Sequence, residues 1–409
     1  MIAPRSPTIS RVLGGELCAG CGLCASVSPD QVEMIVASPG YNRPRQNGPL
    51  RPGAERVIAA VCPGAVVEPW AVATDVHPVW GPWRSVLTGY ATDEAVRWRA
   101  SSGGALTALL IHALRDGEVD RVVHVRADPD HPTRNLMTCS RTEAELLDGA
   151  GSRYSASSPL AAIEGVLADG GAAAFVGKPC DISALRRLSR LDPRVERHIP
   201  LALSFFCAGV PSHDAAERVL AAMGVAPGDV SAFRYRGEGW PGNAAATLAD
   251  GSVRELSYAH SWGDHLSGEV QFRCKICPDA VGGVADIACA DAWYGDDDGY
   301  PTFAEQDGRS LILARTAAGE RLLRSAMAAG TLAAEPLGVD QIDRMQPGQA
   351  RRKRLVRARV AALALALQPV PRMTGTCVEA ASKRAGLAEQ LRNVVGTVRR
   401  IANGRRSRR

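Results

Sequence analysis

Helix-like and strand-like stretches alternate through the middle of the chain, from about residue 100 to residue 224. Apolar residues there either repeat at helical spacing or form the short unbroken runs that are typical of buried strands. Helices are expected at 102–115, 158–170, 181–188 and 212–224, and strands at 122–125, 172–177 and 199–206. Strands separated by helices in this order form parallel βαβ units, which bind ligands at the carboxyl ends of their strands. The pattern therefore predicts an α/β fold with a central parallel sheet.

The first cysteines lie upstream of this stretch. Three of them are separated by equal gaps of two residues in CAGCGLC: Cys18, Cys21 and Cys24. Structural zinc sites usually offer separate CxxC pairs, whereas bacterial ferredoxins use this equal spacing to bind an iron–sulfur cubane. The distant fourth ligand of such a ferredoxin is followed by proline, and Cys62 stands in CPG. We predict one [4Fe-4S] site at these four cysteines, with structural zinc or unliganded thiols as the alternative.

Four more cysteines occur in three separate segments. They are Cys180 in VGKPC, Cys207 in FFCAG, and Cys274 and Cys277 in RCKICPD. Cys180 and Cys207 each follow an expected parallel strand, so the fold would bring them to one edge of the sheet. The CxxC pair could complete a second [4Fe-4S] site there, although such a pair alone is more typical of zinc or a redox dithiol. Cys139, Cys289 and Cys377 have no partner by spacing and are interpreted as ordinary thiols.

Two segments carry groups suited to a phosphate. In RASSGGALTALL the hydroxyls and glycines stand at a helix start, where free N–H groups and the helix dipole favour an anion. The residues concerned are Ser101, Ser102, Gly103 and Gly104, and GSRYSASS adds Ser152, Arg153 and Tyr154. RYRGEGWPG, at 234–242, could supply an aromatic wall and an anion clamp, or could be a surface turn. Taken alone, the first two segments fit an ordinary capped helix and a loop equally well.

Taken in order, these segments resemble the beta-subunit family of coenzyme F420-reducing hydrogenases and F420-linked dehydrogenases, which includes 7-hydroxymethyl chlorophyll a reductase. The matching pieces are CAGCGLC with CPG, RASSGGALTALL, GSRYSASSP, VGKPCDISALRRL, FFCAGVPS, RYRGEGWPG, FRCKICPD with ADIACADAW, and DGRSLILART. They span about residues 15–330. The resemblance implies an iron–sulfur flavoprotein with FAD and one or two [4Fe-4S] clusters, which exchanges electrons with a dissociable substrate such as F420.

Residue by residue, the resemblance assigns the four later cysteines, Cys180 to Cys277, to the second cluster. It assigns the residues of 101–104 and 152–154 to the flavin. Lys178 could place positive charge beside the flavin ring or be an ordinary solvated lysine, and Asp291 could orient a ligand or cap a turn. Both are candidate catalytic residues. Many members of the family read GTPC, CHG and GD where this chain has GKPC, CAG and AD. These departures put F420 itself in doubt as the substrate.

Charge is unevenly distributed along the chain. Residues 351–409 hold 16 Lys and Arg against two Glu, a net +14, which leaves residues 1–350 at −9. A solvated basic tail is one interpretation, and attraction to an anionic membrane surface is the other. The tail has no aromatic residue for stacking on bases, so nucleic-acid binding is not expected. The chain opens without an apolar signal stretch and has no uncharged run of ~20 residues, which predicts a cytoplasmic protein, with the inner membrane surface as a peripheral alternative.

With 409 residues and 46% hydrophobic composition, the chain exceeds a single small domain. We expect a ferredoxin-like [4Fe-4S] segment at 1–80, an α/β flavin-binding domain at 81–225, a smaller α+β part at 226–345 that completes the second cluster, and a basic helical tail at 346–409. The leading hypothesis is an oxidoreductase that passes electrons between the clusters and FAD, with ferredoxin as partner and F420 or another organic compound as substrate. The alternatives are the electron-input beta subunit of a hydrogenase or formate-dehydrogenase-like complex, and a non-enzymatic zinc-stapled adaptor.

Overall fold

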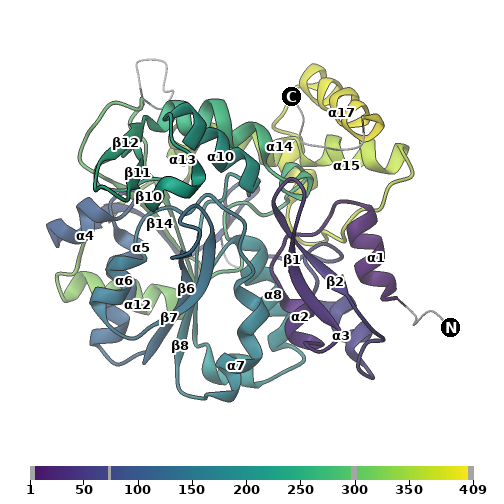
Figure 1. The fold of residues 1–409 in the computed structure, drawn as a ribbon, viewed down its shortest axis with the longest axis horizontal. Helices are drawn as coiled ribbons and strands as arrows, with labels where there is room; N and C mark the ends of the chain where they lie inside the picture. Colours follow the sequence, from purple (N-terminus) through teal and green to yellow (C-terminus); the bar gives the residue numbers. More distant parts are fainter. Residues whose placement is uncertain (1–4, 72–74, 296–301, 404–409) are drawn as a thin grey trace.

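The computed structural model describes residues 5–71, 75–295 and 302–403. Its centre is an eight-stranded sheet (Figure 1). In spatial order the strands are β15 (Leu332–Pro336), β5 (Ser85–Ala91), β14 (Ser310–Ala314), β13 (Ile287–Asp291), β9 (Leu201–Phe205), β8 (Ala173–Gly177), β6 (Arg121–Ala127) and β7 (Asn135–Ser140). Strands β13, β9, β8 and β6 run parallel, and the pairs on either side of them are antiparallel. The predicted α/β fold with a parallel βαβ centre is confirmed, and antiparallel strands extend it at both edges.

The βαβ units form where the pattern places them, because local signals agree with the periodicity. Helix α8 (Pro179–Ser189) begins with proline, which is preorganised for a first helical position. Helix α10 (His213–Ala222) begins after Ser212, whose hydroxyl accepts a hydrogen bond from the backbone N–H of Ala215 at 3.1 Å. Farther along the chain, β11 (Ala244–Leu248) and β12 (Val253–Leu256) form an antiparallel hairpin.

Helices cover both faces of the sheet. One face packs against α5 (Ala105–Arg115), α6 (Glu143–Asp148) and α12 (Ala317–Ala328). The other face packs against α7 (Ile163–Ala168), α8 and α9 (Arg194–His198). The strands between these layers are buried on both sides, and their near-continuous apolar sequences follow from that.

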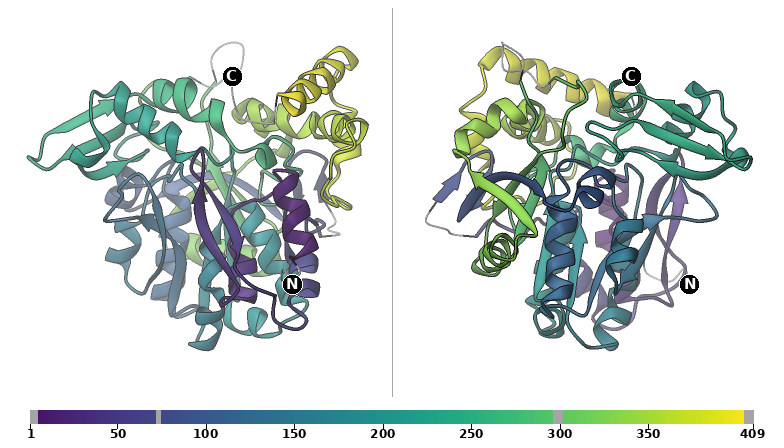
Figure 2. Two further views of the ribbon diagram at one scale, coloured as in Figure 1. Left: turned by 45° about the vertical axis from the view of Figure 1, so that its right-hand side comes forward. Right: turned by 90° about the vertical axis from the view of Figure 1, so that its left-hand side faces the viewer.

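The N-terminal region lies beside α8 on the second face (Figures 1 and 2). Its elements are α1 (Pro7–Gly14), α2 (Leu23–Val27), β1 (Val32–Ala37), β2 (Tyr41–Gln46) and α3 (Ala54–Val61). Strands β1 and β2 form an antiparallel hairpin. Leu23 of α2 and Val61 of α3 join the same apolar cluster as Ile182 of α8, so this region is packed onto the α/β body.

A small second sheet lies above the carboxyl ends of the parallel strands (Figure 1). It consists of β10 (Val230–Arg234), β11 and β12, and α10 packs against it. Shorter elements connect these parts: β3 (Asp75–His77), β4 (Gly81–Trp83), α4 (Glu94–Arg99), the helical turns at 159–162, 227–229, 259–266, 267–269 and 339–341, and α11 (Phe272–Lys275).

The C-terminal region, expected to be a basic helical tail, is helical and folds back onto the body (Figure 2). Its helices are α13 (Ile342–Met345), α14 (Pro347–Arg354), α15 (Val356–Leu365), α16 (Val378–Ser382) and α17 (Leu387–Ala402). Leu363 of α15 is fully buried with Leu17 and Phe272. Within the described residues, no helix combines the length and the apolarity that crossing a bilayer requires. The domain boundaries stay a prediction, and β13 to β15, which lie inside 226–345, are strands of the central sheet.

Candidate functional site

The structure brings the first four predicted cysteines together. Cys18 and Cys21 lie in the loop before α2, Cys24 lies in the first turn of α2, and Cys62 follows the last residue of α3. The thiols of Cys21 and Cys24 interact electrostatically with the thiol of Cys62, and those of Cys24 and Cys62 interact with that of Cys18. We call these four residues the N-terminal cysteine group.

The surroundings of this group disfavour free thiolates. Burial raises the pKa of Cys21 and of Cys24 well above the usual range, and it raises the pKa of Cys62 to about 11. The neighbouring thiols raise all three pKa values further, whereas backbone N–H groups directed at the sulfurs lower them. Several thiolates in one buried place require compensating positive charge, which metal ions supply. The donor set therefore fits a metal cluster.

Two glycines allow the loop to take this shape. Gly20 and Gly22 have φ angles of +78° and +87°, and the backbone N–H of Gly20 lies 3.4 Å from the Sγ atom of Cys18 as a hydrogen-bond donor. A Cβ atom on Gly22 would lie only 2.8 Å from the Cβ atom of Ala161. Glycine is therefore required both for the backbone conformation and for the close approach to the body.

The second four predicted cysteines line a single cavity at the carboxyl ends of β8 and β9. Cys180 lies in the first turn of α8, Cys207 lies two residues beyond β9, Cys274 belongs to α11, and Cys277 follows α11. Burial raises the pKa of Cys180 and Cys277, and raises that of Cys207 to about 12. We call these four residues the cavity cysteine group. Its donor set fits a cluster for the same electrostatic reason.

Lys178 lies beside the cavity cysteine group. Its ammonium group is 2.7 Å from the carboxylate of Asp181 and donates a hydrogen bond to the hydroxyl of Ser157 at 3.0 Å. Burial alone would lower the pKa of Lys178, but Asp181 and the thiols of Cys180 and Cys207 raise it overall. Lys178 is therefore a fixed buried cation at the cysteines. Its assignment to a flavin stays a prediction.

The two cysteine groups are neighbours. Ala19, from the loop of the N-terminal group, lines the cavity of the second group, and its carbonyl accepts a hydrogen bond from Gln271 at 3.2 Å. Arg273 lines the same cavity and donates to the carbonyl of Pro63 at 3.0 Å. Its charge lowers the pKa of both Cys62 and Cys277. One guanidinium group therefore faces both sets of thiols.

The ligand geometry differs from that of a single-ion site. Within the described ranges, no three His, Cys, Asp or Glu side chains converge as the ligands of one metal ion would. A cubane is held by four thiolates, each on a different iron, so its ligands surround a cluster and do not meet at one point. Two sets composed only of thiols favour iron–sulfur clusters or zinc over hard cations such as calcium and magnesium.

The serines and glycines predicted for a flavin are bound to other parts of the protein. Ser152 donates a hydrogen bond to Ser101 at 2.7 Å, and Ser102 donates to the carboxylate of Asp291 at 2.8 Å. A Cβ atom on Gly103 would lie 2.8 Å from the carbonyl oxygen of Gly89 in β5, so this glycine permits close packing on the sheet. Gly104 precedes α5 with a φ of +73°.

Arg153 and Tyr154 also have structural contacts. Arg153 donates to the side chain of Asn135 and to the carbonyls of Pro132, Arg134 and Phe233, which uses four of its five N–H groups. The ring of Tyr154 packs 4.8 Å from that of Trp262. Arg153 thus connects the β6–β7 loop to β10, and this placement does not fit a phosphate ligand.

Asp291 is the acceptor of a buried hydrogen-bond network at the end of β13. Arg236 donates two hydrogen bonds to its carboxylate, at 2.8 and 3.0 Å, and Trp240 donates one at 2.7 Å. Burial raises the pKa of Asp291, but Arg236 and the other donors outweigh burial and hold the pKa below its usual value. Asp291 is therefore a fixed carboxylate that orients its neighbours, and this network leaves it poorly suited to accept a proton.

Aromatic rings enclose the partner of Asp291. The guanidinium group of Arg236, which is 1% exposed, lies 4.8 Å from the ring centroid of Tyr258 and 5.2 Å from that of Trp293. The rings of Trp240 and Trp293 stack at 4.8 Å. The sequence indicated Arg236 and Trp240, but nothing in the pattern identified Tyr258 and Trp293 as their partners.

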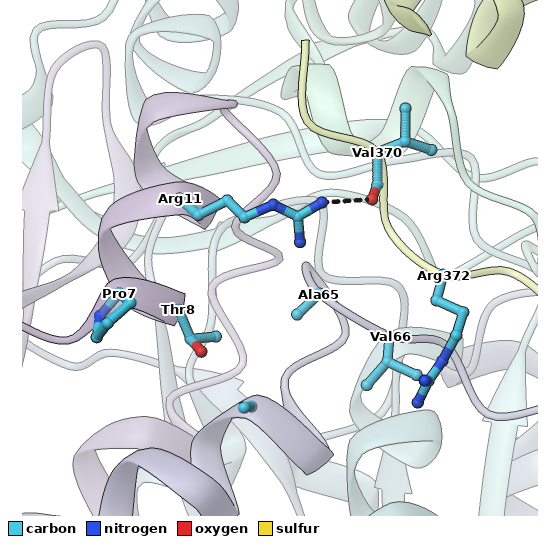
Figure 3. Close-up of a pocket in the computed structure, with 8 residues that line it drawn as sticks. Pro7, Thr8, Arg11, Ala65, Val66, Val370 and Arg372 are labelled. Carbon is cyan, nitrogen blue, oxygen red and sulfur yellow. Dashed lines mark hydrogen bonds between the residues drawn. The ribbon is translucent and has the colours of Figure 1, made fainter.

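An exposed pocket of about 410 Å³ lies beyond the N-terminal cysteine group (Figure 3). It is lined by residues of α1, by Ala59 of α3, by the turn that follows Cys62, and by Val370 and Arg372. Arg11 and Arg372 line it, and Arg11 donates a hydrogen bond to the carbonyl of Val370 at 3.1 Å. Two guanidinium groups in one shallow pocket make it suited to an anionic group.

One residue at the cavity cysteine group had no signal in the sequence. Arg352 of α14 lines the cavity and donates to the carbonyls of Cys207 and Cys274, at 3.1 and 3.0 Å. It belongs to the basic region that was expected to be a tail. Its role depends on the folding of α14 over the cavity, which no local pattern reveals.

The chain matches two family models in succession. Residues 86–164 match the model for the N-terminal part of the coenzyme F420 hydrogenase/dehydrogenase beta subunit, and residues 171–339 match the model for the C-terminal part of that same protein. The matched ranges contain the parallel sheet and the four cysteines of the cavity group. The N-terminal cysteine group and helices α13 to α17 lie outside them.

Individual proteins agree with these matches. The coenzyme F420 hydrogenase subunit beta of Methanococcus voltae is 25% identical over 275 residues, covering 66% of this chain and 88% of the relative. The F420-dependent formate dehydrogenase 1 subunit beta of Methanococcus maripaludis is 29% identical, covering 54% and 57%. A chain of the F420-reducing [NiFe] hydrogenase complex from Methanosarcina barkeri has the same fold, with a TM-score of 0.56 at 20% identity over 74% of this chain and 99% of that one. The chain therefore belongs to the coenzyme F420 hydrogenase/dehydrogenase beta-subunit family.

Proposed function

We propose that this chain is the electron-transferring iron–sulfur subunit of an oxidoreductase complex. The observation that carries the proposal is the gathering of eight cysteines into two adjacent groups of four. The relatives are named as beta subunits of F420 hydrogenases and of an F420-dependent formate dehydrogenase, which favours a subunit role over an enzyme that acts alone.

Under this proposal Cys18, Cys21, Cys24 and Cys62 hold one [4Fe-4S] cluster, and Cys180, Cys207, Cys274 and Cys277 hold the other. Each cluster would supply storage and transfer of single electrons. The surrounding protein buries the thiols, and the glycines of the first loop bring backbone N–H groups close to the sulfurs. Arg273 provides fixed positive charge that faces both sets of thiols, which favours ionised ligands and a more negatively charged, reduced site, whereas the charge of Lys178 is offset at Cys180 by its ion-pair partner Asp181.

Electron entry at the N-terminal group is supported by the pocket of Figure 3. Arg11 and Arg372 line this pocket. Ala65, which also lines it, is only three residues after Cys62 in the sequence. A small acidic electron carrier of the ferredoxin kind would place a carboxylate there, as opposite charges at an interface speed association. We therefore propose that electrons pass between an acidic partner protein, the N-terminal group and the cavity group.

The flavin and its organic substrate, which would exchange electrons in pairs, are a separate part of the proposal. FAD, with F420 or another organic compound as substrate, is implied by the family resemblance. The serines and Arg153 named for the flavin bind one another and other parts of the protein. The measurement for this part is flavin content per chain, independent of the iron count.

The test of the cluster proposal is anaerobic purification of the full chain, with iron, acid-labile sulfide, zinc and flavin measured per chain. Two cubanes require about eight iron and eight sulfide, with absorbance that bleaches on dithionite reduction. Co-purification of a larger catalytic protein would support the subunit role. A colourless preparation that contains zinc and no iron would overturn the proposal and establish the zinc-stapled adaptor.

A further inference from the structure

Helix α17 is attached to the protein by its polar side. Glu389 forms an ion pair with Arg351 of α14, Asn393 accepts a hydrogen bond from Arg359 of α15 at 3.1 Å, and Thr397 is buried. Amphipathic helices of globular proteins normally turn their apolar side inward. In α17 most of the apolar residues face away from the protein, whereas Ile401 near its end packs against the buried cluster of Leu17 and Leu363.

The outward side of α17 carries a stripe of aliphatic side chains. They recur at spacings of four, four and three residues, which places them on one side of a helix. These residues, with their exposed fractions, are Leu387 (79%), Leu391 (65%), Val395 (52%) and Val398 (40%). Leu365 and Leu367, at the end of α15, are also exposed, at 74% and 92%. Figure 1 shows α17 at the outer edge of the molecule, on the side away from the central sheet. A contiguous apolar stripe of this kind marks a binding surface.

Positive charge surrounds the stripe. Arg392 and Arg399 lie beside it on the exposed part of the same helix. Within the described part of this region, residues 383–403 contain five Lys and Arg and a single acidic residue, Glu389, whose carboxylate is already paired with Arg351. The chemistry of this surface is therefore aliphatic side chains with a strong excess of cations.

We propose that α17 is a docking helix for an anionic lipid surface, with Leu387, Leu391, Val395 and Val398 inserted among the lipids and the arginines at the headgroups. A basic helix with one apolar side lies in the interface of a membrane in this way. Four side chains are far fewer than the ~20 residues per side of a stable protein interface, but they suffice for peripheral attachment when each nearby cation adds attraction.

This surface differs from the one expected from the sequence. The basic and apolar run at 351–370 packs against the body: Lys353 and Leu363 are buried, and Arg352 and Arg359 donate to carbonyls of the cavity region. The lipid-facing residues lie instead on the next long helix. The proposal is independent of cluster binding, since it uses only the outer side of α17.

The experiment is vesicle flotation of the full chain, with phosphatidylcholine vesicles and with vesicles that contain roughly one third phosphatidylglycerol. We expect the protein to float with the anionic vesicles only, and to dissociate as salt is raised. Because both residues are exposed, the double variant Leu391→Gln with Val395→Gln should fold normally and bind at least about tenfold more weakly. The variant Arg392→Gln with Arg399→Gln should bind about 30-fold more weakly, as two cations are removed.

The matched control is Leu191→Gln with Val253→Gln, which changes two aliphatic residues of similar exposure, 53% and 50%, elsewhere on the surface. This control should float like the unmodified chain. Equal flotation of the Leu391→Gln, Val395→Gln variant, or failure of the unmodified chain to bind anionic vesicles, would overturn the proposal. A dimer in light scattering that this variant abolishes would also overturn it, and would assign the stripe to a second copy of the chain.

Discussion

The two cysteine groups are built in different ways. The N-terminal group uses one short loop and the end of one helix, so three of its four members lie within seven residues of one another. The cavity group draws on the ends of two parallel strands and on a segment about 70 residues further on, and α14 covers it from the C-terminal region. A local site is encoded in covalent spacing, whereas a site of distant segments depends on the whole fold.

The largest expected effect separates the two groups by their metal content. Cys62→Ser should remove about four iron per chain, and Cys207→Ser should remove a different four, because each group binds its own cluster. Cys139→Ser, a substitution of an exposed cysteine outside both groups, should leave the iron count unchanged. Iron and sulfide analysis with electron paramagnetic resonance measures this. Loss of all iron from either variant would mean that the groups are not separate sites.

A large effect on stability is expected at Asp291. Asp291→Asn would leave the buried guanidinium of Arg236 without its ion pair, which should lower the free energy of unfolding by about 3–5 kcal/mol. The exposed pair of Arg234 and Glu238 is the control, since Glu238→Gln should cost less than about 1 kcal/mol. Urea unfolding measures both. Equal costs would show that the buried network contributes no more than a surface pair.

A smaller effect should distinguish the cavity group from the N-terminal group. Arg352→Gln removes charged hydrogen bonds to the carbonyls of Cys207 and Cys274, at a cost of about 2 kcal/mol. We expect the second set of iron atoms to be lost faster to a chelator and its reduction potential to fall, with the first set unaffected. Arg351→Gln, on the same helix but directed toward Glu389, is the control. Identical rates of iron loss in the two variants would show that Arg352 has no special role at the cavity cysteine group.

The smallest effect concerns the contact between the N-terminal region and the rest of the chain. His213 packs against Gly40, its backbone N–H donates to the Gly40 carbonyl at 3.1 Å, and burial lowers its pKa to about 4. The unfolded chain binds this proton near pH 6.5, so the contribution of the neutral histidine to stability is complete above that pH and falls by about 1–2 kcal/mol between pH 7 and pH 5.

His213→Gln should remove this contribution. The matched comparison is His124→Gln in β6 of the central sheet, where burial also lowers the histidine pKa to about 4. The measurement is urea unfolding at pH 7 and pH 5. A stability difference between the unmodified chain and His213→Gln that stays constant with pH would contradict the assignment.

Much of the central fold could be predicted from residue pattern. Strands β6, β8 and β9 and helices α5, α8 and α10 lie where apolar periodicity and capping residues place them, because these signals act over a few residues. The antiparallel edge strands were not expected as members of the same sheet. Their pairing is long-range. Strand β5, for example, lies between β14 and β15 in the sheet, although more than 200 residues separate β5 from either of these strands in the sequence.

The candidate site divides in the same way. Spacing alone indicated the N-terminal cysteine group, whereas strand ends and a separate CxxC pair left the cavity group open to a zinc or redox alternative until the family resemblance favoured a cluster. Arg153 shows the limit of motif reasoning, since its position in a polar loop suggested a phosphate ligand, yet its N–H groups bind backbone carbonyls. A side chain's partners depend on which segments meet around it, and one stretch of sequence does not contain that information.

The βαβ order, the N-terminal cysteine loop and the excess of positive charge in the C-terminal region could all be predicted from the residue pattern, because periodicity, spacing and composition are properties of neighbouring residues. The contact of Arg352 with the cavity cysteines, the ion pair of Asp291 with Arg236, and the outward orientation of the leucine and valine stripe of α17 could not be predicted in this way. Each of these depends on contacts between residues tens to hundreds of positions apart, which form only when the packing of the whole chain brings them together.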